Sequence, residues 1–435
     1  MKRLQSRAAI VLVTVLLSTL GLGALLARLV LHGDEWAAYS ANAHVYRSGV
    51  LACGTLTDRS GVVLFSAKNG QYAYAEEEAV RFASLHAVGD HRGNVGGSAL
   101  SLFADELAGY SLLNGTDGTG GEVTLSLDSR LQAGAWYALN GRPGAVVVMN
   151  YETGEVLCMV SSPAYDPLYG QRWDADGVYI NRTVGGLYIP GSIFKLVTFT
   201  AAAENIPDLT SRTFTCTGAL ELAGEEVHCT GVHGEQTIEQ ALANSCNCAF
   251  GTLALELGGQ TLHDTAVRLG VAGSLDWNGG RTAEGRFDIA ARGSAPLAWS
   301  GIGQYNDLVT PYAMARLCAG IANGGVAREG VLLAGETGRA ERIMTADTAE
   351  FIGECMNYNV VYAYGKNNFP WLDLCAKTGT AELGDGSTHA WFVGYLRSGA
   401  PLAFAVLLEQ GGGGLVAAGG VANHVLQLAN GYYAS

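Results

Sequence analysis

The pattern of hydrophobic and polar residues begins with one long apolar segment. Residues 8–27 carry no charge and are mostly apolar, and a helix of about 20 such residues can cross a bilayer. Lys2, Arg3 and Arg7 precede the segment. Because basic flanks stay on the inner side of a membrane, the pattern predicts a cytoplasmic N-terminus with the rest of the chain outside. A cleaved signal peptide is the alternative, although its apolar region is usually only about 7–15 residues long.

A small unit is predicted after this anchor. Residues 56–64 have the pattern of a strand, a turn and a second strand, and residues 75–114 carry helical signals, including Ser98 as a start signal. The run 114–121 is rich in glycine and predicts a domain boundary. The chain is therefore expected to divide into a cytoplasmic tail at 1–7, an anchor at 8–31, an extracellular pedestal at 32–121 and a main domain at 122–435.

Strands stand at both ends of the main domain, around a helical middle. Apolar runs predict strands at 144–149, 155–160, 372–376, 389–396 and 402–409. Helical patterns lie at 128–140, where Asp128 is the expected cap, and at 190–205, 237–258, 310–323 and 421–430. This order predicts an α+β fold whose first and last strands share one sheet.

Composition narrows the class of function. The chain is 49% hydrophobic and only 15% charged, which is typical of a globular protein. Its net charge of −14 argues against nucleic-acid binding, which needs a basic surface. Only five of the 26 basic residues are lysines, namely Lys2, Lys68, Lys195, Lys366 and Lys377. Because arginine does not lose its proton, a retained lysine can mark a site that needs a neutral amine.

A serine and a lysine three residues apart form the first candidate site. Ser192 and Lys195 follow the chain-breaking pair Pro190-Gly191 at the start of a predicted helix. Positions i and i+3 share one helix face, so the Lys195 amine can reach the Ser192 hydroxyl and accept its proton. A capping serine beside a solvated lysine is the alternative, and roughly a quarter of one such match is expected by chance.

The second candidate is Lys377-Thr378-Gly379-Thr380, on the first of the three late strands. Strand alternation predicts that Lys377 faces a cleft. Lysine and threonine suit a substrate carboxylate, Gly379 permits close approach, and the N–H of Thr380 can point at an oxyanion. A solvated strand lysine is the alternative, but only about 0.04 matches to Lys-Thr-Gly are expected by chance. The third candidate, Ser245-Cys246-Asn247, is on its own more typical of a turn or cap.

These three motifs, in this order, resemble the S-x-x-K, S-x-N and K-T-G elements of the penicillin-recognising serine enzymes. Within them the chain is similar to the class B penicillin-binding proteins, and the resemblance covers most of its length. The matching segments are 58–61, 144–167, 301–311 and 391–395. Cys53-Gly54 departs from the Arg-Gly that the family usually has. Both Lys195 and Lys377 fall at motif positions.

The resemblance implies a β-lactamase/transpeptidase-like antiparallel sheet flanked by helices and an enzyme of the bacterial cell wall. It would be a single-pass membrane D,D-transpeptidase that cross-links peptidoglycan stem peptides and is acylated by β-lactams. Ser192 would be the nucleophile and Lys195 the general base, with a pKa lowered by burial and by the Lys377 cation. Ser245 would pass the proton to the leaving D-Ala.

The resemblance also implies how substrate is held, with no metal and no cofactor. Asn247 would hold the peptide backbone, and Lys377 and Thr378 the terminal carboxylate. The N–H groups of Ser192 and Thr380 would form an oxyanion hole, in which one donor typically contributes about 3–4 kcal/mol. The implied substrate-binding residues are therefore Asn247, Lys377, Thr378, Gly379 and Thr380.

Nine cysteines raise a separate question in an exported chain. Cys216 and Cys229 flank a predicted hairpin, and a disulfide between them is one possibility. Zinc is the alternative, since His228 and His233 are near, but the spacing matches no common zinc pattern. Cys246 and Cys248 could be a metal pair, although the sequence favours small buried thiols.

Other functions remain open at this stage. A D,D-carboxypeptidase would use water as the acceptor, and the motifs do not separate it from a transpeptidase. A β-lactamase, a β-lactam sensor and a non-catalytic scaffold of a cell-wall complex are further alternatives. No glycosyltransferase-like segment is recognised before residue 122, so the resemblance implies a polytopic membrane glycosyltransferase as partner. Elongation, division and sporulation roles are not distinguished.

Overall fold

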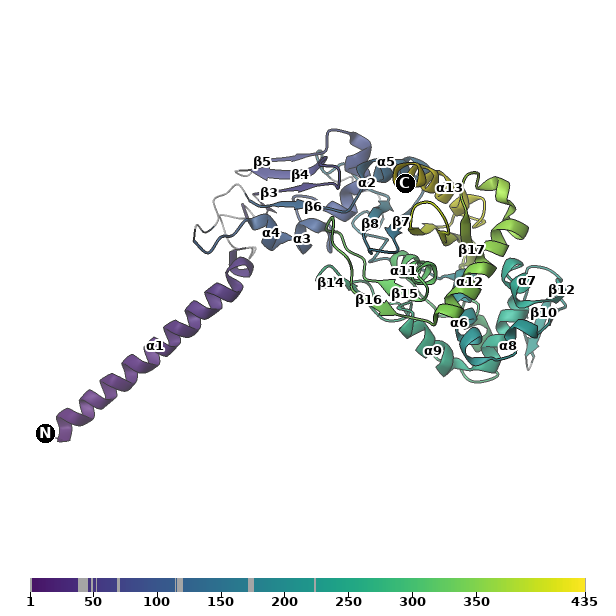
Figure 1. Cartoon of the computed structure of the whole chain (residues 1–435), viewed down its shortest axis with the longest axis horizontal. Coiled ribbons are helices and arrows are strands. Elements are labelled where there is room, and N and C mark those ends of the chain that lie inside the picture. The colour runs from purple at the N-terminus through teal and green to yellow at the C-terminus, as the bar shows by residue number, and fades with distance from the viewer. Residues whose placement is uncertain are drawn as a thin grey trace.

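A long N-terminal helix leads into a small unit that packs against a larger α+β unit (Figure 1). This computed structural model describes residues 2–37, 46–47, 50–51, 53–68, 71–113, 115, 120–170, 176–222 and 224–434. Most of the predicted boundary run at 114–121 lies outside the described residues.

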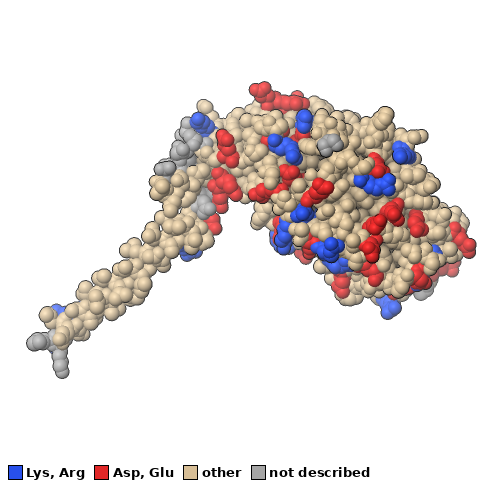
Figure 2. Space-filling view, viewed as in Figure 1, with Lys and Arg blue, Asp and Glu red and all other residues tan. Residues whose placement is uncertain are grey.

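The N-terminal helix α1 (Lys2–Ala37) fits a membrane anchor. Its stretch Arg3–Gly33 is long and apolar enough to span a bilayer, and none of its most apolar window is buried in the protein. At 1.5 Å per residue this stretch is about 46 Å long, more than the hydrocarbon core of about 30 Å. The helix projects away from the rest of the molecule (Figure 1), and most of its visible surface carries no charged side chains (Figure 2).

The small unit is built on a four-stranded sheet with the order β5-β4-β3-β6. Its strands are β3 (Gly54–Thr57), β4 (Val63–Lys68), β5 (Gln71–Tyr74) and β6 (Glu122–Thr124). The antiparallel pair β3–β4 confirms the predicted strand–turn–strand unit. Strand β6 pairs parallel with β3, so this sheet extends past the predicted domain boundary at residue 121.

One buried carboxylate joins the small unit to the larger one. Asp58 in the β3–β4 turn accepts hydrogen bonds from the backbone N–H groups of Ser60 at 2.8 Å and Val62 at 2.9 Å. It also accepts one from Ser129 N–H at 3.1 Å. Ser129 begins helix α5 (Ser129–Leu139), so a single turn fixes the strand pair against the main domain.

The helices of the small unit are α2 (Glu78–Val88), α3 (Ala99–Leu102) and α4 (Ala104–Ala108), and two short strands are β1 (Tyr46–Arg47) and β2 (Val50–Leu51).

The main domain contains a five-stranded antiparallel sheet with the order β17-β18-β19-β7-β8. Its strands are β7 (Gly144–Asn150), β8 (Val156–Ser162), β17 (Leu374–Glu382), β18 (Thr388–Leu396) and β19 (Leu402–Leu408). The pairing of β19 with β7 confirms that the first and last strands of the domain share one sheet. Strand β17 extends beyond the predicted apolar run because it pairs with β18 as far as Glu382, and the Lys-Thr-Gly motif lies on it as predicted.

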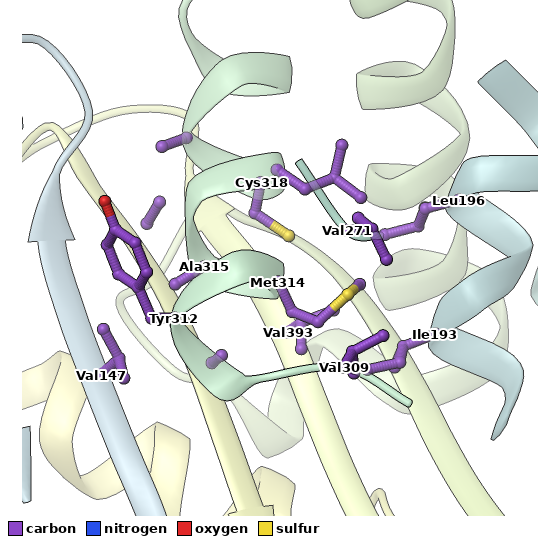
Figure 3. Packing of buried hydrophobic residues seen from close by; sticks show 14 of the residues in the cluster. Val147, Ile193, Leu196, Val271, Val309, Tyr312, Met314, Ala315, Cys318 and Val393 are labelled. Atoms are coloured by element: carbon purple, nitrogen blue, oxygen red, sulfur yellow. The ribbon is translucent and has the colours of Figure 1, made fainter. Parts of the chain in front are cut away.

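Helices cover both faces of this sheet, because successive side chains of a strand point to opposite faces. On one face, Val147 and Val393 pack with α11 (Pro311–Ala322), whose Met314 side chain also points toward Ile193 (Figure 3). The other face packs against α5 and α13 (Ala417–Tyr433). These two apolar layers enclose the sheet that carries the Lys-Thr-Gly motif.

The predicted helix at 128–140 is confirmed with its cap. The Asp128 side chain accepts from Arg130 N–H at 2.9 Å, and Asn140 ends the helix in the left-handed conformation, with φ 49°. Tyr433 in α13 donates to Asp128 at 2.6 Å. Such a cap typically contributes about 1 kcal/mol, and here it also attaches the C-terminal helix.

The helical middle differs from prediction in one important place. The single helix expected at 237–258 is two helices, α7 (Ile238–Ala243) and α8 (Asn247–Leu257). Ser245 between them has φ 52°, which no right-handed helix accommodates. The predicted helix at 190–205 begins with a 3₁₀ turn, η1 (Gly191–Phe194), before α6 (Lys195–Asn205).

The remaining elements surround this lobe. The helices and turns are η2 (Leu209–Ser211), α9 (Gly259–Arg268), α10 (Ala295–Ser300), α12 (Ala346–Tyr358), the π-helical η3 (Asn359–Gly365) and η4 (Lys366–Asn368). The strands are β9 (Phe214–Cys216), β10 (Ala219–Leu222), β11 (Glu225–His228), β12 (Gly234–Gln236), β13 (Asp276–Trp277), β14 (Gly280–Arg281), β15 (Val326–Arg328) and β16 (Ala340–Arg342).

The predicted hairpin between Cys216 and Cys229 is confirmed as β10–β11, but the disulfide suggested there is not formed. Cys216 and Cys229 are both free thiols. Cys216 Sγ lies 3.6 Å from Cys248 Sγ, and Cys229 Sγ lies 3.8 Å from Cys246 Sγ. A disulfide needs sulfurs about 2.05 Å apart, so each cysteine of the hairpin is in non-bonded contact with a cysteine near the start of α8.

Candidate active site

The three motif segments meet in one place, and the oxygen that both lysines contact is that of Ser245 rather than that of Ser192. Lys195 Nζ lies 3.0 Å from Ser192 Oγ and 3.2 Å from Ser245 Oγ. Lys377 Nζ, from β17, lies 3.0 Å from the same Ser245 Oγ. Two amines and two hydroxyls from three separate segments of the chain therefore form one hydrogen-bonded network through which protons can move.

Two glycines allow the η1 turn to lie directly against the edge strand β17. Gly191 has φ 55°, and a Cβ there would lie 2.9 Å from Thr380 O. A Cβ on Gly379 would lie 3.0 Å from Pro190 O. Side chains at either position would push the two backbones apart. The turn that carries Ser192 is therefore held beside Thr380, the position from which a backbone N–H could face a reacting carbonyl.

A third glycine supports the same turn from the segment that resembles the family at 301–311. Gly303 has φ 80°, and a Cβ on it would lie 2.1 Å from Gly191 O. Its own carbonyl accepts a hydrogen bond from Gly191 N–H at 2.8 Å. The glycine pattern of this segment therefore serves to position the nucleophile turn.

Ser245 has a left-handed backbone conformation, which is uncommon for a residue other than glycine. Its positive φ costs a non-glycine residue of order 1–3 kcal/mol, and it points the side chain and the carbonyl of Ser245 at Lys195. The Ser245 carbonyl accepts from Lys195 Nζ at 2.7 Å. Cys246 caps α8 by accepting a hydrogen bond from Ala249 N–H. The segment therefore also forms the turn and cap that are typical of Ser-x-Asn.

Both lysines are fully buried, and burial changes their charge. Burial lowers the pKa of Lys195 to about 7, against smaller opposing effects of Cys246, Cys229 and Cys248. Burial and then the charge of Lys195 hold the pKa of Lys377 well below its usual range. The predicted effect of burial on Lys195 is confirmed. The sequence also predicts that the charge of Lys377 lowers the pKa of Lys195. The structure shows the repulsion acting the other way, since the charge of Lys195 lowers the pKa of Lys377.

The expectation that Lys377 faces an open cleft is wrong. Its side chain is fully buried, because the Ser245 segment lies over it. The cavity beside it, of about 190 Å³, is lined instead by Ser192, Ser245, Asn247, Thr378, Thr380 and Trp299, among others. A ligand in this cavity meets hydroxyl and amide groups first, with both amines directly behind them.

Both polar groups of the Asn247 side chain form hydrogen bonds within the protein, which the sequence does not indicate. Its Oδ1 accepts from Lys195 Nζ at 2.7 Å, and its Nδ2 donates to His228 O at 2.8 Å. The side chain therefore orients Lys195 while it lines the cavity. Contact with a substrate backbone, the role implied by the resemblance, stays a prediction.

Tyr364 is a site residue that sequence reasoning misses. Its hydroxyl accepts from Thr378 N–H at 3.1 Å and lies 3.3 Å from Thr378 Oγ1. Burial raises the pKa of Tyr364, so the phenol stays protonated. The tyrosine lies in the π-helical turn η3, and no motif or period in the sequence marks this position.

Comparison with known proteins points to one family. The family model described as the penicillin binding protein transpeptidase domain matches residues 144–427 of this chain. The peptidoglycan D,D-transpeptidase PbpA of Mycobacterium tuberculosis is 30% identical over 367 residues, which are 74% of this chain and 74% of that protein.

Solved structures agree with this match. The D,D-transpeptidase domain of a peptidoglycan glycosyltransferase from Eggerthella lenta is 27% identical, with a TM-score of 0.74 over 87% of this chain and 98% of that one. Penicillin-binding protein A of Mycobacterium tuberculosis, in its penicillin G acyl-enzyme complex, is 25% identical with a TM-score of 0.73, over 87% of this chain and 99% of that one.

Proposed function

Because the chain belongs to the penicillin-binding protein transpeptidase family, we propose that it cross-links peptidoglycan stem peptides through an acyl-enzyme on Ser192, and that β-lactams acylate the same oxygen. The observation that supports this most is the 3.0 Å contact between Ser192 Oγ and the buried amine of Lys195. A serine is a weak nucleophile until a base removes its proton, and a buried lysine with a pKa of about 7 can be that base near neutral pH.

Acylation would proceed in balanced steps. Lys195 Nζ takes the hydroxyl proton of Ser192, and Ser192 Oγ attacks the carbonyl carbon of the penultimate D-Ala. The N–H groups of Ser192 and Thr380 stabilise the oxyanion. As the C–N bond breaks, Ser245 gives its proton to the leaving D-Ala nitrogen and recovers one from Lys195. The amine of a second stem peptide then attacks the ester, and Ser192 leaves with a proton.

The lysine pair would respond to substrate charge. A terminal carboxylate held by Thr378 lies near Lys377, and a nearby negative charge favours the protonated form of Lys377. Two ammonium groups around one Ser245 oxygen repel each other, so charge on Lys377 favours a neutral Lys195. Gly379 leaves room for the substrate strand, and Asn247 orients the base. Substrate binding would thus prepare Lys195 to accept the proton.

A product assay tests the reaction. The full chain in detergent is incubated with glycan strands that bear pentapeptides, and the products are separated and identified by mass. Cross-linked peptide dimers are expected, and penicillin G should suppress them. Tetrapeptides without dimers would identify a carboxypeptidase instead, and continuous turnover of nitrocefin would identify a β-lactamase.

We propose the same topology that the sequence predicts, with residues 1–7 in the cytoplasm, residues 8–31 of α1 in the cell membrane, and the pedestal and catalytic domain outside. By family resemblance, the partner would be a polytopic membrane glycosyltransferase that contacts α1 and the pedestal. A photo-crosslinking residue in place of Leu17, which is exposed on α1, should capture such a protein in cells. Capture by that position of lipid alone would contradict the proposed contact.

A further inference from the structure

Four cysteines form a compact cluster beside the candidate active site. The Sγ atoms of Cys216, Cys229, Cys246 and Cys248 all lie within 4.8 Å of one another. Cys216 ends β9, Cys229 follows β11, and Cys246 and Cys248 flank the first residue of α8. Figure 1 shows α8 together with β10 and β12, the pairing partners of β11 and β9, at one end of the helical lobe. Three separate segments therefore converge on one point with the same side-chain type.

The distances suit a shared metal ion better than disulfides. Sulfurs around a tetrahedral zinc ion lie roughly 3.8 Å apart, because each Zn–S bond is about 2.3 Å long. The two shortest pairs here are 3.6 Å for Cys216–Cys248 and 3.8 Å for Cys229–Cys246. Pairing into disulfides would require each to close to about 2.05 Å.

The surroundings suit thiolates. Asn247 N–H donates to Cys229 Sγ at 3.2 Å, and Ala249 N–H donates to Cys246 Sγ at 3.5 Å. His233 Nδ1 lies 3.5 Å from Cys229 Sγ. Such donors stabilise and orient metal-bound sulfur. Three of the four side chains are almost fully buried, so a bound ion would be shielded from water and would have no open position for catalysis.

We propose that Cys216, Cys229, Cys246 and Cys248 bind one Zn²⁺ ion in a closed, structural site. Four sulfur ligands in a tetrahedral arrangement select zinc or iron among common metals, and zinc needs no change of oxidation state. Four thiols would bind one Zn²⁺ and release four protons, which leaves a site with a net charge of −2. The unusual spacing, with a 12-residue hairpin between the first pair and one residue between the second, explains why no zinc motif is recognised.

The site would fix the segment that positions Lys195. Cys246 and Cys248 flank Asn247, whose side chain links Lys195 to the β10–β11 hairpin through His228 O. Ser245, in its positive-φ conformation, is the next residue upstream. Joining both ends of this segment and the hairpin to one ion would hold the costly backbone of Ser245 in place. The ion would therefore act on catalysis through position, not through contact with substrate.

Metal analysis of the full chain tests the proposal without any activity assay. Protein purified in detergent under anaerobic, reducing conditions should contain about one zinc per chain. Exchange with Co²⁺ should produce the intense visible absorption and the sulfur-to-metal charge-transfer band of a tetrahedral thiolate site. Stoichiometric iron would overturn the zinc assignment. The absence of any bound metal would overturn the site, as would a mass lower by the four hydrogens of two disulfides.

Variants connect the metal to these sulfurs. Cys216→Ser and Cys248→Ser should each lose most of the zinc and lower the rate of acylation by penicillin at least about tenfold. Cys355→Ala, a buried thiol on α12 outside the cluster, should keep both. Full zinc content in both serine variants would contradict the ligand assignment. If those variants fail to fold, the wild-type metal content and cobalt spectrum still decide the question.

Discussion

Replacing Ser192 by alanine is expected to abolish covalent labelling of the full chain by a fluorescent penicillin. The change removes only the oxygen that lies 3.0 Å from Lys195 Nζ, and no acyl bond can form without it. The measurement is in-gel fluorescence after denaturation, at penicillin concentrations that saturate the wild type.

The matched control is Ser211→Ala. Ser211 lies in η2 and donates only to the nearby Asp208 O in the described structure, so labelling should be unchanged. Undiminished labelling of Ser192→Ala would show that another residue is the nucleophile and would remove the basis of the proposed mechanism.

Replacing Lys195 by arginine is expected to slow acylation by about 10²–10⁴-fold, the usual contribution of a general base. Arginine keeps the positive charge but cannot give up its proton near neutral pH. The measurement is the second-order rate of penicillin acylation, with thermal unfolding of the variant to confirm that the fold is kept. Lys366→Arg, at an exposed lysine in η4, should acylate at the normal rate. A folded Lys195→Arg variant with near-normal acylation would exclude Lys195 as the base.

The wild-type pH profile follows from the same amine. Burial lowers the pKa of Lys195 to about 7, so the neutral, base-competent form prevails above that pH and is lost below it. The acylation rate should therefore fall as pH drops through about 7 and level off above it. Lys377 from β17 and the thiols of Cys229, Cys246 and Cys248 are the charged or titratable groups that act on Lys195 or are acted on by it.

The substrate effect on the lysine pair is visible in the same experiment. The profile at low penicillin reports the free enzyme, and the profile at saturation reports the complex. If the ligand carboxylate favours charge on Lys377, the midpoint at saturation should lie at lower pH than the midpoint at low penicillin. A midpoint shifted to higher pH would contradict that coupling.

The central sheet and the nucleophile turn are largely predictable from sequence, because local signals and tertiary contacts agree there. The apolar runs of β7, β8, β18 and β19, which are buried over most of their length, and the Asp128 cap specify those elements. Ser192 and Lys195 are adjacent on one turn, so their contact depends only on local geometry. The resemblance to a known family then places β17 beside that turn.

The rest depends on contacts that no local pattern encodes. The Ser-x-Asn motif is compatible with a turn or cap, but it does not specify the positive φ of Ser245, which brings this residue into contact with Lys195 and Lys377. The burial of Lys377 and the contact of Tyr364 with Thr378 arise from segments far apart in sequence. The four-cysteine cluster joins β9, β11 and α8, and pairwise spacing along the chain suggests a hairpin disulfide instead.

The most direct test of the account is to find the atom that carries the drug. The full chain is saturated with penicillin G, digested, and mapped by tandem mass spectrometry. We expect one adduct per chain, on the peptide that contains Ser192 and on that serine itself. An adduct on any other residue, or a chain that stays unmodified, would contradict the claim that Lys195 and Ser245 serve Ser192 as the attacking oxygen.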